Sequence, residues 1–120
     1  METSVNNKCK AFTSLEQSRK LANILPLESA DMFYSAGNET QPTFRLHSYG
    51  HIMSDKDVCA WSLAALLGVL PDCPDLSKHT DNKWYITTYP NDVHTCLMAY
   101  DNPVDACYEM IIRLNELTLL

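Results

Sequence analysis

The chain has 120 residues, of which 46% are hydrophobic, a length and composition that suit one packed domain. Nine Lys and Arg against fifteen Asp and Glu give a net charge of -6, which disfavours binding to nucleic acid or anionic lipid. No segment approaches the roughly 20 apolar residues of a membrane span, and the start of the chain lacks the apolar core of a signal peptide. The five cysteines are an odd number without the close spacing of a disulfide framework, which indicates reduced thiols. We therefore expect a cytoplasmic protein without membrane contact.

A polar segment without hydrophobic periodicity covers residues 1–12, and we expect it to be loosely ordered ahead of a single domain at residues 13–120. That domain begins with a short amphipathic helix, because apolar residues recur on one face until Pro26. Two residue pairs have the spacing of an N-terminal capping box, namely Thr13 with Glu16 and Ser14 with Gln17.

Two strands are expected next, between residues 31 and 49. Apolar residues alternate there with polar ones, at Met32 and Tyr34 in the first strand and at Phe44 and Leu46 in the second. Gly, Asn and Pro between the two segments favour a turn.

The most apolar stretch is DVCAWSLAALLGVL, residues 57–70, which predicts the central helix of the domain. Ser54 with Asp57 would cap its start, and Pro71 prevents its continuation. Because such a helix is apolar nearly all round, it must be covered on several sides, with Trp61 in the core.

Residues 71–82 contain two prolines and no apolar period, which predicts a connection on the surface. Residues 83–100 then predict a hairpin, since two segments rich in aromatic and β-branched residues flank Pro-Asn-Asp. A final amphipathic helix starts with Asn102 as N-cap and Pro103 at its first position. The expected fold is therefore α+β in the order α-β-β-α-β-β-α, with an antiparallel sheet of two hairpins, three helices and a buried central helix.

The loop length of the second hairpin decides which side chains face the core, because adjacent residues of a strand point to opposite sides. With a three-residue loop, the core side carries Trp84, Ile86, Cys96, Met98 and Tyr100. The other side then carries Tyr85, Tyr89, Val93 and Leu97. A loop with an even number of residues would swap the faces of the second strand and bring Leu97 and Val93 beside Trp84.

Two tyrosines and two aliphatic side chains are more than a solvated sheet face needs, and this composition is favoured at interfaces. Alternatively, the first helix covers this face of the hairpin, which then belongs to the core. The interface prediction assigns binding of a protein partner, either a second copy of the chain or another protein, to Tyr85, Tyr89, Val93 and Leu97.

The best case for an enzyme combines Cys59 at the start of the central helix with His94 on a later strand. The amides at a helix start lower the pKa of a thiol, and a cysteine hydrolase with a papain-like chain order has its Cys on a helix and a His after it. Cysteine is, however, among the most buried residue types, which favours a packing role for Cys59. We predict no catalytic residue, with a hydrolase that uses Cys59 and His94 as the alternative.

A metal site could be assembled only from scattered residues, because the chain has no paired Cys-x-x-Cys. With only three glycines there is also no phosphate-binding loop. We expect no metal and no cofactor. The scattered candidates for metal ligands are His47, His51, Cys73 and His79.

Four segments carry a resemblance to a known family: SLEQSRKLANILPLESADMFY, CAWSLAALLGVLP, KWYITTY and DNPVDACYEMIIRLNEL. In this order they resemble a family of short uncharacterised proteins from gut anaerobic bacteria and their phages or mobile elements. The family has a Cys-Trp-Ser-Leu helix, whereas Ala60 separates Cys59 from Trp61 here. The resemblance implies a small accessory protein of mobile or accessory DNA, and it brings no known activity, substrate or cofactor. By elimination, we predict a protein-interaction or regulatory module, and its acidic charge suits a basic protein partner.

Overall fold

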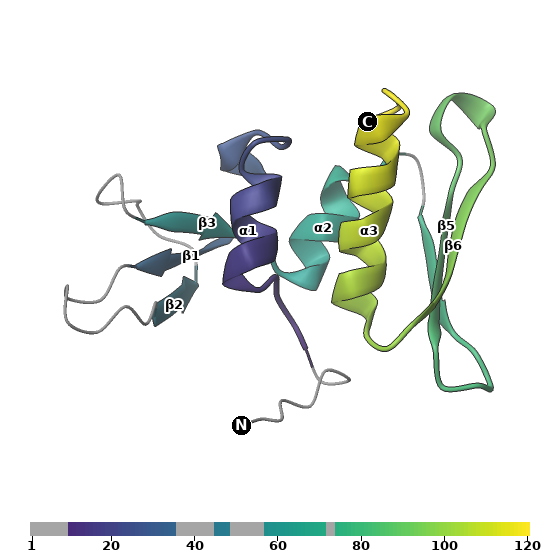
Figure 1. The fold of residues 1–120 in the computed structure, drawn as a ribbon, viewed down its shortest axis with the longest axis horizontal. Helices are drawn as coiled ribbons and strands as arrows, with labels where there is room; N and C mark the ends of the chain where they lie inside the picture. The colour runs from purple at the N-terminus through teal and green to yellow at the C-terminus, as the bar shows by residue number, and fades with distance from the viewer. Residues whose placement is uncertain (1–9, 36–44, 49–56, 72–73) are drawn as a thin grey trace.

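Three helices lie between two small sheets in the computed structural model, which describes residues 10–35, 45–48, 57–71 and 74–120 (Figure 1). Each sheet has three antiparallel strands, in the orders β2-β1-β3 and β4-β5-β6. The α+β class is therefore confirmed, with one strand more on each side of the central helix than the sequence predicts.

The first sheet contains both strands expected between residues 31 and 49. They are β1 (Met32–Ser35) and β2 (Arg45–Ser48). The third strand, β3 (Val58–Ala60), pairs with the other side of β1, so that Phe33 lies opposite Cys59.

Helix α1 (Leu15–Leu21) begins with the second of the two possible capping boxes. The Ser14 hydroxyl accepts from the Gln17 amide at 3.1 Å, and the Gln17 side chain accepts from the Ser14 amide at 3.0 Å. Thr13 is instead fully buried and bonded to other parts of the chain. A short 3-10 turn, η2 (Leu27–Ser29), follows the helix.

The central helix α2 (Leu63–Val69) is shorter than predicted, because the first residues of the apolar stretch form β3. A short apolar run suits a buried strand as well as a helix, and here pairing with β1 satisfies its backbone. The true N-cap is Ser62, whose hydroxyl accepts from the Ala65 amide at 3.2 Å. The expected cap Ser54 lies outside the described residues. Leu66 is the fully buried residue of α2, and the helix is covered less completely than the sequence predicts, since Ala64 and Gly68 are exposed. Four further residues pack partly buried against the core: Leu63, Ala65, Leu67 and Val69.

Trp61 occupies the junction between β3 and α2 and is 0% exposed. Its indole nitrogen donates to the Ser29 hydroxyl at 2.9 Å. Its backbone pairs with Thr13, since the Thr13 amide donates to the Trp61 carbonyl at 3.0 Å and the Thr13 hydroxyl accepts from the Trp61 amide at 3.1 Å. This residue therefore ties the first sheet to the start of α1.

The second sheet contains β4 (Asp75–Lys78), β5 (Trp84–Thr88) and β6 (Thr95–Tyr100). The hairpin of β5 and β6 is confirmed, but the prediction of a plain surface connection is wrong where β4 forms. Apart from Leu76, β4 has only polar side chains, so its sequence carries no alternation that would reveal a strand.

The register of the second hairpin corrects the predicted core face. Thr88 pairs with Thr95, so the loop has an even number of residues, and Leu97 lies opposite Ile86 in the core. An irregularity in the pairing follows, and because Ala99 has a φ of 70° there, Tyr100 returns to the position opposite Trp84. Two residues expected in the core are exposed instead, Cys96 and Met98.

Helix α3 (Pro103–Glu116) forms as predicted, with the Asn102 side chain accepting from the Asp105 amide at 2.7 Å. It lies beside α2 on one side and against β5 and β6 on the other (Figure 1). Much of the core belongs to this helix, through the fully buried side chains of Val104, Ala106, Cys107, Met110, Ile111 and Leu114.

A polar cluster around Asp105 joins α3 to α1. Lys10 and Gln17 both donate to one carboxylate oxygen of Asp105 at 2.8 Å, and Asn102 donates to the other at 2.8 Å. Burial by itself raises the pKa of Asp105, but the hydrogen bonds from Lys10, Gln17 and Asn102 outweigh it, so the pKa is lowered.

The Asp105 cluster predicts a loss of stability in acid. Because the folded-state pKa lies below the unfolded value of about 3.9, the cluster stabilises the fold above that pH and stops doing so as pH falls through the folded pKa. We expect Asp105→Asn to reduce the drop in the free energy of unfolding between neutral pH and strong acid, as measured by urea denaturation. Lys10→Met should reduce it by a smaller amount. An Asp105→Asn profile parallel to that of the wild type would contradict this account.

Candidate functional site

Well-exposed large apolar side chains gather at one end of the molecule. The described part of the chain has six of them, and five belong to η2, the loop between β5 and β6, or the C-terminal segment after α3. These three segments lie at the same end in Figure 1, at the top of the view. We call the five residues the end surface: Leu27, Tyr89, Val93, Leu117 and Leu120.

A groove of about 450 Å³ opens at the same end of the molecule (Figure 1) and shares Leu120 with the end surface. Its walls come from the ends of all three helices, so that segments far apart in the sequence meet there. The loop of the second hairpin is fixed beside it, because the Thr88 hydroxyl donates to the carbonyl oxygen of Pro71, a residue of the groove wall, at 2.7 Å. The groove is lined by Ile24, Leu25, Pro26, Val69, Pro71, Asn115 and Leu120.

The hairpin loop holds its apolar side chains outward. A 3-10 turn, η3 (Pro90–Asp92), forms in it, and Asn91 takes a positive φ of 49°. Pro90 is buried and anchors the turn, whereas Tyr89 and Val93 on either side of it are 45% and 47% exposed. The rings of Tyr89 and His94 lie 5.3 Å apart, which supports the outward position of the tyrosine.

The structure brings together two of the four residues predicted to bind a partner. Tyr89 and Val93 belong to the end surface. Tyr85 lies on the outer face of the second sheet, stacked on His79 at 3.7 Å and donating to Asp81 at 2.6 Å. Leu97 is turned into the core by the even-numbered loop, so its predicted outward position is wrong.

Sequence reasoning missed the remaining members of the end surface. Leu117 and Leu120 come after the last turn of α3, and Leu27 follows a proline between two elements. The signal that could have found them is apolar residues placed beyond the buried stripe of a helix, where no core position requires them.

The second sheet leaves one face without a covering helix among the described elements. Helix α3 packs on the inner face, and α1 packs on β3 of the other sheet, so the prediction that the first helix covers this hairpin is wrong. Met98 on the outer face is 65% exposed. Both edges of the sheet are unsuited to adding a strand, since β4 is short and ends in Asp75 and Lys78, and β6 carries the irregularity at Ala99.

The geometry needed for a cysteine hydrolase is not formed. Cys59 lies in strand β3 and not at a helix start, it is 5% exposed, and burial raises the pKa of its thiol. A raised pKa keeps the thiol protonated, which is the opposite of what a nucleophile needs. His94 is exposed on the hairpin loop of the second sheet, and its described ring contact is with Tyr89.

The described residues contain no group of three His, Cys, Asp or Glu side chains that could hold a metal ion. Of the scattered candidate ligands, His51 and Cys73 lie outside the described residues, and His79 stacks on Tyr85. Within the same described part of the chain, no helix is long and apolar enough to cross a membrane.

Comparison with known proteins adds no relative to this picture. No protein-family model matches the chain, and neither do any curated protein or any solved structure. The function therefore has to be argued from the end surface and the rest of the described geometry.

Proposed function

We propose that this protein is a protein-interaction module whose end surface binds an amphipathic helix with a basic rim. The observation that carries the proposal is a groove that contains Leu120 and opens at the end of the molecule where the other four residues of the end surface also lie (Figure 1). Exposed apolar side chains that gather in one region of a surface often mark a binding site, whereas single scattered ones do not. The setting of accessory or mobile DNA, which the sequence resemblance implies, stays a proposal, and the chemistry of the partner does not depend on it.

A helix suits the groove better than an extended strand does. Three helix ends form its walls, and a groove of about 450 Å³ can take side chains spaced at i, i+3 and i+4 on one face of a helix. Strand addition would require an open sheet edge, and both edges of the second sheet are protected by charge or by irregular backbone.

Charge favours a basic partner over a second copy of the chain. Three members of the end surface have an acidic residue as direct sequence neighbour, namely Glu28, Asp92 and Glu116, and no member has a Lys or Arg neighbour. The whole chain carries a net charge of -6, so two copies of it repel each other. A partner helix with Lys or Arg beside its apolar face would instead be attracted to the chain.

The test uses a synthetic helical peptide of Leu and Lys with Leu at i, i+3, i+4 and i+7. We expect saturable binding in fluorescence anisotropy, and we expect Val93→Ser combined with Leu120→Ser to weaken it at least about tenfold, or ~1.4 kcal/mol. Met98→Ser is the matched control, because it removes a more exposed apolar side chain outside the end surface and should leave the affinity unchanged.

Two further measurements can overturn the proposal. A scrambled peptide of the same composition has the same charge but no apolar face, so equal affinity for it would reduce the interaction to unspecific attraction. Sedimentation of the protein alone, at increasing concentration, tests the second copy. A dimer that disappears in the Val93→Ser, Leu120→Ser variant would make another copy of this chain the occupant of the groove.

A further inference from the structure

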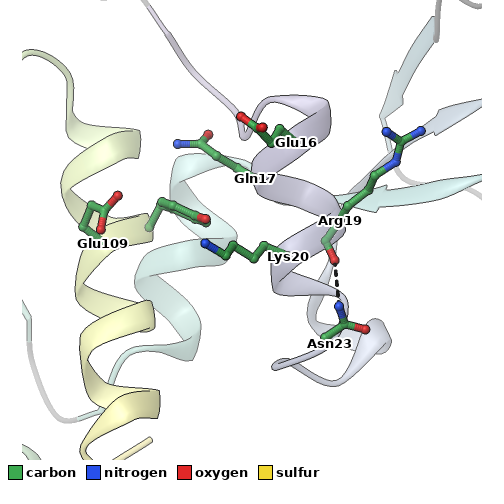
Figure 2. Close-up of a pocket in the computed structure, with 7 residues that line it drawn as sticks. Glu16, Gln17, Arg19, Lys20, Asn23 and Glu109 are labelled. Atoms are coloured by element: carbon green, nitrogen blue, oxygen red, sulfur yellow. Dashed lines mark hydrogen bonds between the residues drawn. The ribbon is translucent and has the colours of Figure 1, made fainter.

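A second, polar groove lies between α1 and α3, and the end surface is not part of it. It has a volume of about 570 Å³, within the range of small-molecule sites. In Figure 2 Lys20 extends from α1 towards α3, where Glu109 lies opposite, while the guanidinium of Arg19 points away from α3. The lining residues are Glu16, Gln17, Arg19, Lys20, Asn23, Tyr108 and Glu109.

Two of the lining side chains are already held by bonds within the protein. The Gln17 side chain donates to Asp105 at 2.8 Å and accepts from Lys10 at 2.7 Å. Asn23 donates to the Arg19 carbonyl oxygen at 3.5 Å, the bond drawn in Figure 2. Gln17 therefore has little capacity left for a ligand, whereas Asn23 uses only one of its two N–H donors in this bond.

Four other groups in the groove have no hydrogen-bond or ion-pair partner among the described residues: the Lys20 ammonium, the carboxylates of Glu109 and Glu16, and the Tyr108 hydroxyl. Tyr108 is only 8% exposed as a whole residue, and it lines the groove, where a hydroxyl without a protein partner can donate to a ligand. Burial, with smaller effects of Glu109 and Glu16, raises its pKa, so the group is an O–H donor at neutral pH. Lys20 and Glu109 face each other across the groove without closing an ion pair.

We propose that this groove binds a free α-amino acid, with Lys20 and Tyr108 donating to its carboxylate and Glu109 accepting from its ammonium group. A ligand that lies between Lys20 and Glu109 (Figure 2) must satisfy one cation, one hydroxyl donor and one anion at once. A simple anion would meet Glu109 and Glu16, and a simple cation would meet Lys20, so each alone is opposed by part of the wall. An α-amino acid carries both charges on one carbon atom, whereas a longer peptide separates them.

The probes are glycine and three relatives that each lack one feature. Glycinamide has no carboxylate, N-acetylglycine has no ammonium group, and triglycine separates the two charges. We expect glycine to give saturable amide shifts in NMR spectra at residues 16–23 and 105–112, and each relative to bind at least about tenfold more weakly.

Variants assign the contacts. Lys20→Gln and Glu109→Gln should each weaken glycine binding about tenfold or more, and Tyr108→Phe, which keeps the buried ring, should weaken it about three- to tenfold. Lys78→Gln is the matched control, since it removes an exposed lysine from β4 and should change nothing.

The proposal fails if glycine gives no saturable shifts, if N-acetylglycine binds as tightly as glycine, or if Lys20→Gln keeps full affinity. Equal binding of triglycine would assign the groove to peptide ends and overturn the free amino acid. These outcomes leave the end surface untested, because the two sites share no residue. The Val93→Ser, Leu120→Ser variant therefore leaves every residue of this groove in place.

Discussion

Replacing Trp61 by Ala should lower the free energy of unfolding by about 3–5 kcal/mol, the cost of removing a large aromatic side chain from a core. The side chain is 0% exposed and lies where the first sheet, α1 and α2 meet. Its indole also donates to the Ser29 hydroxyl, a bond that Ala removes.

Urea denaturation followed by circular dichroism measures this effect. Trp61→Phe is the control, because it keeps most of the apolar volume and loses the bond to Ser29, so it should cost much less than Ala. A loss below about 1 kcal/mol for Trp61→Ala would place the residue at the surface and contradict the junction described above.

Thr13→Val should lower the free energy of unfolding by about 1–3 kcal/mol although it barely changes the shape of the side chain. Thr13 is fully buried, and its hydroxyl accepts from the Trp61 amide and contacts the Ser18 hydroxyl at 2.7 Å. Valine leaves that amide buried without a partner, which costs more than the bond itself contributes. The carbonyl oxygen of Thr13 still accepts from the Tyr34 hydroxyl at 2.7 Å in the variant.

The Thr13→Ser variant distinguishes the contribution of the hydroxyl to stability from that of the methyl group. Serine keeps the bond to Trp61 and gives up one methyl, so it should be more stable than valine at this position. The same denaturation experiment compares the two. A valine variant as stable as the serine variant would mean that the Trp61 amide finds another partner.

The elements that the sequence predicted correctly have their determinants close together in the chain. Helix α3 has its cap at Asn102, a proline at its first position and a buried stripe, and these local features act whatever surrounds them. Strand β3 could not be distinguished from the helix that follows, because its partner β1 lies far back in the sequence. Strand β4 has one apolar side chain, and its pairing with β5 decides its structure.

The candidate site was less predictable than the fold for the same reason. Tyr89 and Val93 were found from their composition, but the even-numbered loop that holds them outward turned Leu97 into the core. Pro26 and Leu120 line the same groove although they are far apart in the sequence, because the fold places the segment before η2 and the segment after α3 at the same end of the molecule (Figure 1). No local pattern in the sequence predicts that these two segments come together.

The late position of α3 in the chain has a consequence for how the protein is made. Synthesis proceeds from the N-terminus at about 5–20 residues per second, so the partners of α3 emerge before it does. Until that helix is complete, Leu66 of α2 and Ile86 of β5 have no counterpart on which to pack. The nascent chain therefore exposes this apolar surface until α3 has been synthesised. Apolar surface exposed in this way makes an incomplete chain prone to aggregation, which is the hazard that chaperones limit.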